Sequence, residues 1–292
     1  MGTRGARIHL VIIDPQNDFL GNDDGSPYSI NIGGGKSLTA TLSVPGAVSD
    51  MKRVAKLVDR VGHKLADIHV TLDSHRLVDV AHPAFWMDQK GKQPSPFTII
   101  SASDIMSGIW TTRYPALRSY ALVYAQALES TPGGYKICVW PAHCLIGTWG
   151  HNVFTDLNDA LQRWSDREFA MVDYVTKGSN YRTEHYGALM SEVPDPNDPS
   201  TGLNTEFLKM LADADVVAVA GEASSHCVLK TVTQIADNIG TDHIKKFHLL
   251  RDCMSPVPAI PNIVDFPAIA EAWLKDMERR GMTVTTSDEF LA

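Results

Sequence analysis

One stretch in the last third of the chain limits the folds that it can adopt. Residues 216–231 read VVAVAGEASSHCVLKT. The apolar run 216–220 is typical of a buried parallel strand, Gly221 breaks it, and a helical pattern follows with Cys227 in its first turn. A strand that turns directly into a helix is the repeating unit of an α/β fold.

The same stretch places a thiol at a helix N-terminus. Unpaired N–H groups and the helix dipole stabilise a thiolate there, so we expect the pKa of Cys227 to be lowered and the residue to be a nucleophile. The alternative from spacing alone is a buried structural cysteine, because free cysteine is among the most buried residue types.

Apolar segments and helical patterns alternate along the rest of the chain. Strands are expected near 8–13, 68–72, 170–175, 216–220, 247–250 and 282–286, and helices near 45–63, 114–128, 153–164, 225–238 and 267–280. This alternation predicts an α/β fold with a doubly wound, Rossmann-like sheet, mostly parallel, of about six strands with helices on both faces.

The length of 292 residues and the 44% hydrophobic content suit a single domain, 1–292, with loop insertions near 21–44, 87–134 and 187–203. Residues 179–203, which include the last insertion, are expected to form a mobile surface loop because they are rich in Asn, Pro, Asp and Gly. The first contains GGGKS, but Ile30 stands where a phosphate loop needs glycine, so a flexible loop or hairpin is expected instead.

Charge and cysteine usage narrow the class of partner. A net charge of −8 without a long basic run argues against nucleic acid or an anionic membrane as a partner and favours a small molecule. Four cysteines without paired spacing, no apolar N-terminal segment and no stretch long enough to span a bilayer favour a reducing compartment, the cytoplasm.

Three candidate catalytic residues follow expected strands. Because the carboxyl ends of parallel strands meet at one sheet edge, Asp14, Lys177 and Cys227 are expected to converge there. The carboxylate can take the thiol proton and pass it to a leaving amine, while the ammonium holds both groups. Taken singly, Asp14 could be a polar strand terminus and Lys177 a solvated loop lysine.

Histidines near the same edge suggest a metal site. Asp73 and His75 follow a strand, and His143 lies in a later loop. A carboxylate and two imidazoles suit a divalent ion with open positions for water or substrate, and His82 could complete or support the site. Each histidine alone could equally be hydrogen-bonded or exposed.

Five motifs resemble those of the isochorismatase-like cysteine hydrolases, and of nicotinamidases most. They are DPQNDF at 14–19, DSH at 73–75, WPAHCLIGT at 140–148, KG at 177–178 and GEASSHCV at 221–228. The WPxHC element discriminates, because it is similar to the nicotinamidase metal and substrate motif.

The resemblance implies roles for the three candidate catalytic residues and for the metal site. Cys227 would be the nucleophile, Asp14 the general acid and base, and Lys177 the orienting cation. Asp73, His75 and His143 would bind one divalent ion, zinc in the first place, with iron or manganese as alternatives.

The resemblance also implies a substrate pocket. Phe19 and Trp140 would form an aromatic slot, with His82 near the family's additional histidine. A non-proline cis peptide at Glu222–Ala223 would point the N–H groups of Ala223 and Cys227 at one spot as an oxyanion hole.

The function expected from the resemblance is a metal-dependent amidohydrolase that converts nicotinamide to nicotinate and ammonia through a cysteine thioester. Its partners would be a small-molecule amide and further copies of the chain. The alternatives are another carboxamide or N-carbamoyl substrate, and a binding protein that keeps the fold without turnover. Glu222 replaces an aliphatic residue of the family and Ser225 an aspartate, which affects specificity more than chemistry.

Overall fold

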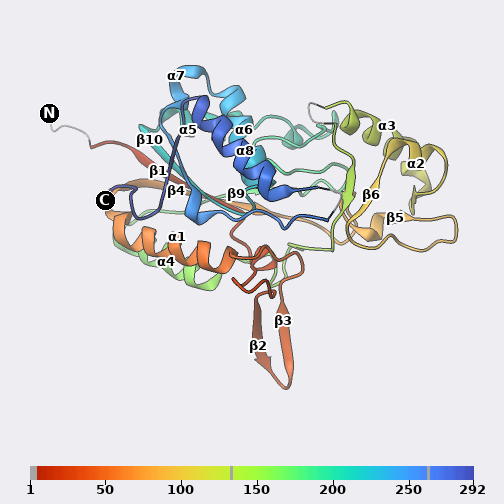
Figure 1. The fold of residues 1–292 in the computed structure, drawn as a ribbon, viewed down its shortest axis with the longest axis horizontal. Coiled ribbons are helices and arrows are strands. Elements are labelled where there is room, and N and C mark those ends of the chain that lie inside the picture. The colour runs from red at the N-terminus through yellow and green to blue at the C-terminus, as the bar shows by residue number, and fades with distance from the viewer. Residues whose placement is uncertain (1–4, 132–133, 262–263) are drawn as a thin grey trace.

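The computed structural model describes residues 5–131, 134–261 and 264–292, and a six-stranded sheet lies at its centre (Figure 1). All neighbouring strands of this sheet run parallel, in the order β12-β11-β10-β1-β4-β9. The strands are β1 (Ile8–Ile13), β4 (Leu65–Asp73), β9 (Asp173–Lys177), β10 (Val216–Gly221), β11 (Phe247–Leu250) and β12 (Thr283–Thr285). The expected doubly wound α/β sheet is thus confirmed.

Helices cover both faces of the sheet because alternate strand residues feed two hydrophobic clusters. Leu10 and Ile12 pack under α1 (Ala47–Val61) and α4 (Thr155–Glu168). Val11 and Ile13 pack against the other layer, which contains α5 (Thr205–Asp213), α6 (Cys227–Asn238) and α8 (Phe266–Arg279). The two layers lie on opposite sides of the sheet in Figure 1. The central strands are therefore buried on both faces.

Several short helices complete the fold. The four-residue helix α7 (Thr241–Ile244) precedes β11. Single turns of 3-10 helix lie at Asn17–Phe19, Gly62–Lys64, Pro83–Phe85, Pro115–Leu117, Pro199–Thr201 and Arg251–Cys253.

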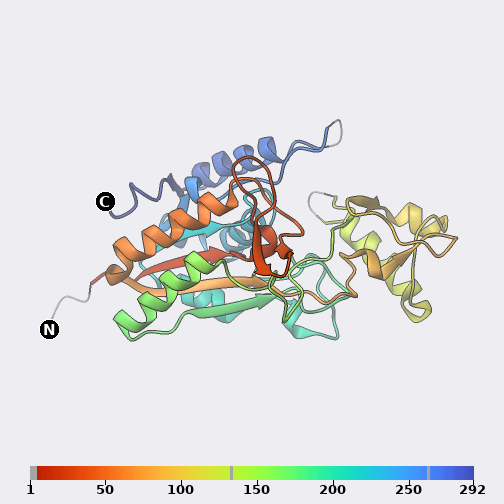
Figure 2. The ribbon, with the colours of Figure 1, turned by 90° about the horizontal axis from the view of Figure 1, so that it is seen from below.

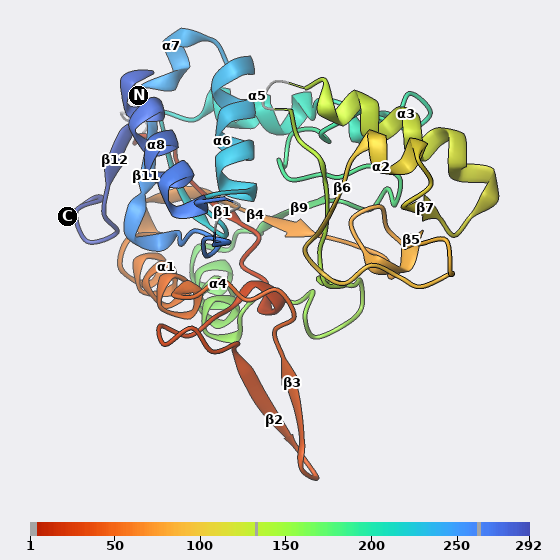
Figure 3. The same ribbon diagram turned by 45° about the vertical axis from the view of Figure 1, so that its right-hand side comes forward.

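The glycine-rich segment near residue 35 is the turn of a β-hairpin. Strands β2 (Ser29–Gly33) and β3 (Lys36–Thr39) pair antiparallel, and Gly33, Gly34 and Gly35 have φ values of 86°, 61° and 73°. Glycine adopts this left-handed backbone without the steric cost that a side chain brings. The hairpin projects from the body of the molecule (Figure 3).

The insertion expected near 87–134 belongs to a small lobe beside the carboxyl edge of the sheet (Figure 2). Its elements are β5 (Trp86–Met87), β6 (Thr98–Ile100), α2 (Ala102–Met106), β7 (Thr111–Thr112), α3 (Arg118–Glu129) and β8 (Ile137–Val139). Strand β5 pairs with β7 and β6 with β8, both antiparallel. Phe85, Trp86 and Tyr124 anchor a hydrophobic cluster that is separate from the two around the sheet.

The prediction of a mobile surface loop at 179–203 is wrong with respect to exposure. Ala188, Leu189 and Thr201 are buried. The backbone N–H groups of Leu189 and Met190 donate to the Gln234 side chain on α6, at 3.2 and 3.3 Å. The polar composition suggested an exposed loop, but side chains of α6 accept hydrogen bonds from this backbone in place of water, so the segment can be buried.

None of the helices in the described ranges combines the length and the apolar character that crossing a bilayer requires.

Candidate active site

Four chemically active side chains meet at the carboxyl edge of the sheet. Asp14 follows β1, while Asp73 and Lys177 end β4 and β9 as cross-strand partners. Cys227 opens α6, directly after β10 and its turn. Because β10, β1, β4 and β9 are neighbours in the sheet, residues far apart in sequence converge at this edge.

Lys177 is the centre of this group. Its Nζ lies 3.0 Å from Asp14 Oδ2, 3.0 Å from Asp73 Oδ1 and 3.7 Å from Cys227 Sγ. It also donates to the carbonyl of His185 at 3.0 Å. All four side chains of the group are buried, so water does not screen these charges.

The pKa shifts in this group follow from burial and from the paired charges. Burial opposes the charge on Lys177, but Asp14 and Asp73 outweigh it and hold its pKa well above the usual value. Burial also opposes ionisation of Asp73, yet His75 and Lys177 hold its pKa well below the usual value. At neutral pH Lys177 is an ammonium and Asp73 a carboxylate.

The pKa of Cys227 is raised, so the expectation of a lowered value is wrong. Burial is the main cause, and the Lys177 ammonium offsets it only in part. The helix N-terminus does not overcome the loss of solvent around the sulfur. The resting thiol is therefore protonated, and a base must take its proton before it can attack.

Asp14 is positioned to be that base. Its backbone has a φ of 45°, which is uncommon for a residue with a side chain. Its N–H donates to the carbonyl and hydroxyl oxygens of Thr71 at 3.2 and 3.0 Å, and the Thr71 hydroxyl donates to Oδ1. Burial raises the pKa of Asp14, with Lys177 opposing, which increases its basicity over an exposed carboxylate.

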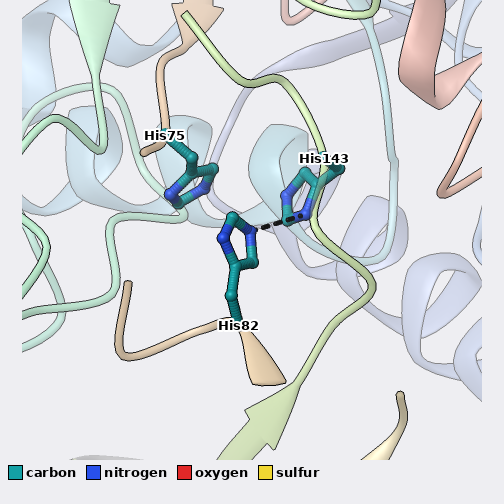
Figure 4. A group of neighbouring side chains, drawn as sticks. All are labelled: His75, His82 and His143. Atoms are coloured by element: carbon teal, nitrogen blue, oxygen red, sulfur yellow. Dashed lines mark hydrogen bonds between the residues drawn. The ribbon is translucent and has the colours of Figure 1, made fainter. Parts of the chain in front are cut away.

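Three imidazoles face one another beside this group (Figure 4). One ring nitrogen from each of His75, His82 and His143 lies within 4.8 Å of the others, and His82 Nε2 is 3.3 Å from His143 Nδ1. Asp73 Oδ2 lies 3.1 Å from His75 Nε2 and 3.3 Å from His143 Nε2. The structure thus brings Asp73, His75 and His143 together, as expected.

Two positions are expected for His82, among the metal ligands or beside the substrate, and the structure agrees with the first. Its imidazole lies in this histidine group, and His82 is not among the residues that line the cavity described below. Burial lowers the pKa of His82 to about 2. Its imidazole is therefore neutral, which is the form that binds a metal ion.

Backbone pairing locks the histidine loops together. His75 N–H donates to the Cys144 carbonyl at 3.1 Å, and Ile146 N–H donates to the His75 carbonyl at 3.0 Å. Cys144 N–H in turn donates to Asp18 Oδ2 at 2.7 Å. The three motifs that contain Asp18, His75 and His143 therefore form one connected structure.

A largely apolar cavity of about 40 Å³ opens onto Cys227. Phe19 and Trp140 line it, as expected, and Trp140 Nε1 donates to the Tyr186 hydroxyl at 3.0 Å. Its lining residues are Phe19, Leu42, Val44, Asp73, Trp140, His143, Glu184, Tyr186, Ala223, His226, Cys227 and Val257. Flat aromatic walls beside a thiol suit a small planar amide.

The sequence alone did not point to three residues of the site: Glu184 and Tyr186 in the cavity wall and Asp79 behind the histidines. Asp79 Oδ2 lies 3.0 Å from His75 Nδ1, and the spacing His75-x-x-x-Asp79 was the available signal. Glu184 and Tyr186 lie in an irregular segment whose sequence carries no periodic pattern. Burial raises the pKa of Glu184 to about 8, so a residue of the cavity wall carries a carboxyl group that can hold its proton near neutral pH.

The peptide bond between Glu222 and Ala223 is cis, as expected. Ala223 lines the cavity, and Cys227 opens α6, where first-turn N–H groups lack helical acceptors. Glu222 and Ser225, the two residues that differ from the family pattern, anchor the neighbouring loop 255–257. Ser255 N–H donates to Glu222 Oε2 at 3.1 Å, and Val257 N–H donates to Ser225 Oγ at 3.0 Å.

The chain is similar to known proteins in its fold but not in its overall sequence. No protein-family model matches the chain, and neither does any curated protein. Among solved structures it is similar to a nicotinamidase/pyrazinamidase from Acinetobacter baumanii, with a TM-score of 0.58, 19% identity, and 99% of this chain and 100% of that one covered.

Two further similar structures broaden the comparison. A pyrazinamidase of Pyrococcus horikoshii in complex with zinc has a TM-score of 0.52 and 17% identity, with 96% of this chain and 99% of that one covered. An isochorismatase-like hydrolase from Alkaliphilus metalliredigens has a TM-score of 0.50 and 16% identity, with 98% of both chains covered. The resemblance in the motifs is matched in the fold: the chain has the fold of the nicotinamidases and of this isochorismatase-like hydrolase.

Proposed function

We propose that the chain is an isochorismatase-like cysteine hydrolase that converts nicotinamide and water to nicotinate and ammonia. The observation that carries the proposal is the contact of Asp14, Lys177 and Cys227 beside a histidine cluster and an aromatic cavity. A binding protein without turnover would have no use for a buried base, cation and thiol in mutual contact.

Asp14 begins the reaction by taking the Cys227 proton. The thiolate attacks the amide carbon, and the resulting oxyanion accepts hydrogen bonds from the N–H groups of Ala223 and Cys227. The protonated Asp14 then gives its proton to the nitrogen, the C–N bond breaks, and ammonia leaves. The product of this half-reaction is a thioester on Cys227.

Water completes the cycle through the same residues. Asp14 takes a proton from a water molecule, which attacks the thioester carbon, and the C–S bond breaks. The sulfur recovers a proton from Asp14, and nicotinic acid leaves and loses its own proton to solvent to become nicotinate. Lys177 stays charged throughout and balances the negative charge that moves between Asp14 and Cys227.

The donor set beside this group suits a divalent ion of the zinc class. His75, His82 and His143 offer imidazole nitrogens, and Asp73 adds a carboxylate in contact with two of them. When bound, the ion would supply a Lewis acid for the pyridine nitrogen or for a water molecule; iron and manganese accept similar ligands.

The metal affinity should depend on pH. Burial opposes protonation of His75, but Asp73 and Asp79 outweigh it and hold its pKa well above the usual value. An ion must displace that proton to bind His75, so the zinc affinity should rise as the pH rises.

Glu184 supports a second candidate substrate class within the same chemistry. Glu184 lines the cavity, and its carboxyl group could form a hydrogen bond to a second amide or amino group on the substrate. Another carboxamide or an N-carbamoyl compound with such a donor would use this contact.

An assay of ammonia release from nicotinamide by the zinc-loaded chain tests the proposal. We expect turnover that disappears in Cys227→Ala and persists in Cys138→Ala, whose thiol lies in the small lobe. A panel of other carboxamides and N-carbamoyl compounds assigns the substrate. No ammonia from any member, or equal release by Cys227→Ala, would contradict the assignment as a cysteine hydrolase.

A further inference from the structure

A second group of metal-binding side chains lies near the amino ends of the strands, opposite the candidate active site. In the sheet register His9 of β1 pairs with Asp67 of β4, and His69 of β4 pairs with Asp173 of β9. Cross-strand partners, and residues two apart on a strand, share one face of a sheet. The register therefore places all four side chains in one row on the face covered by α5 and α6.

The ring nitrogens in this row point at each other. His9 Nδ1 lies 3.0 Å from His69 Nε2, and a carboxylate oxygen of Asp67 completes a set of three atoms within 4.8 Å of one another. Metal–nitrogen bonds of about 2.0–2.1 Å at tetrahedral to right angles need nitrogens about 2.9–3.4 Å apart. The observed separation satisfies that requirement.

A further carboxylate orients the inner histidine. Asp173 Oδ2 lies 2.8 Å from His69 Nδ1, which therefore carries the proton, and the lone pair of His69 Nε2 faces His9 and Asp67. The Phe207 ring packs edge-on against His69 with centroids 5.4 Å apart and fixes its plane. A carboxylate behind a histidine is the usual outer support of a metal ligand.

Solvent reaches one side of the group, and burial favours the neutral form of its outer imidazole, His9. His69 is fully buried, whereas His9 and Asp67 are partly exposed, so an ion can reach the row from solvent. Burial lowers the pKa of His9, and the facing His69 ring lowers it further. The nearest cations are engaged elsewhere, Arg7 with Asp215 and Lys246 with the carbonyls of Ala212 and Ala214.

We propose that His9, Asp67 and His69 bind one divalent ion of the zinc class, with Asp173 supporting His69 and water completing the coordination. Two imidazoles and one carboxylate match zinc, with nickel and copper as competitors in a binding test. We name this group the His9 site. It uses no residue of the candidate active site and is independent of the proposed function.

Zinc binding to the metal-free full-length chain tests the His9 site. In a His75→Ala/His143→Ala background, which lacks two ligands of the candidate active site, we expect about one zinc per chain by calorimetry and elemental analysis. Adding His9→Gln or Asp67→Asn should weaken that binding by about 100-fold or more, and Asp173→Asn by about 10–100-fold. His63→Gln, a change at an exposed histidine, should have no effect.

Cobalt provides a readout without enzymatic activity, because its visible absorption reports tetrahedral nitrogen and oxygen ligands. If the background variant fails to fold, the wild-type chain should bind about two zinc ions and His9→Gln about one. Two results would overturn the proposal: a His75→Ala/His143→Ala variant that folds but binds no zinc, or zinc binding that is the same with and without His9. Either would show that the four side chains form only hydrogen bonds with one another. Ammonia release is scored separately, so either proposal can fail alone.

Discussion

At the scale of single residues, the chemistry depends on which group holds the proton. Burial raises the pKa of Cys227, so the thiol does not ionise on its own near neutral pH. Asp14 has Thr71 on one carboxylate oxygen and the Lys177 ammonium on the other. In the proposed reaction the thiolate therefore forms by proton transfer within the site and not through the helix N-terminus.

Replacing Asp14 by asparagine should keep the shape of the site and remove the base. We expect kcat for ammonia release to fall by about 10²–10⁴-fold, the usual contribution of a positioned acid or base. Alkylation of Cys227 should slow in parallel because its thiolate forms less readily. Asp24→Asn, at an exposed turn, is the control, and undiminished kcat in Asp14→Asn would contradict the assigned role.

Glu184 makes stability depend on pH. Burial raises its pKa from 4.5 to about 8 in the folded chain, so between those values the folded state keeps a proton that the unfolded state has lost. Stability should therefore fall as the pH rises through this window, by about 4–5 kcal/mol at most.

Glu184→Gln should remove this loss, so its stability relative to wild type should improve from pH 4.5 to pH 8. Urea unfolding of the metal-free chain at both pH values measures the difference. Glu206→Gln, exposed in α5, should show no such trend. An equal pH dependence in wild type and Glu184→Gln would contradict the raised pKa.

At the scale of elements, the turn between β10 and α6 sets the direction in which the nucleophile enters the site. Gly221 has a φ of 126°, and a side-chain carbon there would lie 2.1 Å from the Ile13 carbonyl oxygen of the neighbouring strand. Only glycine lets the two backbones approach this closely.

Gly221→Ala should therefore lower the free energy of unfolding by about 2 kcal/mol or more, because the new methyl group would clash with backbone atoms of Ile13, which cannot move away as a flexible side chain could. Gly5→Ala, with nothing within 4 Å, is the matched control. Denaturant unfolding of both variants measures the difference. Equal unfolding midpoints for Gly221→Ala and Gly5→Ala would contradict the prediction, because they would show that β1 and β10 can move apart at little cost in free energy.

The loop 255–257 is a second element whose anchoring reaches the cavity. Ser225 Oγ accepts the Val257 N–H, and Val257 lines the cavity. Ser225→Ala should loosen this wall and raise KM by about 3–10-fold with little change in kcat, in line with the loss of one hydrogen bond. Ser103→Ala in the small lobe should leave KM unchanged, and a selective fall in kcat for Ser225→Ala would instead place Ser225 nearer the chemistry.

At the scale of the whole molecule, the hydrophobic residues divide into two clusters around the sheet and a smaller third in the small lobe. Regions with less buried apolar surface open locally at lower free energy. Amide hydrogen exchange should therefore be faster in α3 of the lobe than in β1 and β10. Equal protection in all three would show that the lobe unfolds only with the sheet.

The sheet was predictable because its central strands β1 and β10 are largely apolar on both faces. The predicted ranges for β1 and β11 match the structure, whereas β9 begins at Asp173 and not near 170. Met171 is apolar but 88% exposed, which periodicity alone does not reveal. Helix α5 was missed because its pattern follows a long polar segment.

The meeting of Asp14, Lys177 and Cys227 was predictable for the same reason, since parallel strands carry their ends to one edge. Glu184 and Tyr186 were not predictable, because side-chain contacts with α6 and the small lobe place them, and no repeat in the sequence encodes such contacts. The pKa of Cys227 was mispredicted because depth of burial is a property of the assembled molecule.

Lys177 contacts two carboxylates, Asp14 beside the sulfur of Cys227 and Asp73 beside the imidazoles of the histidine group. In the proposed function a single ammonium thus supports both the group that would break the amide bond and the group that would hold the metal ion. Neither group can be redesigned alone: any change that moves or neutralises this amine alters the two together, and a transplant of the site into another scaffold has to carry the lysine as its first component.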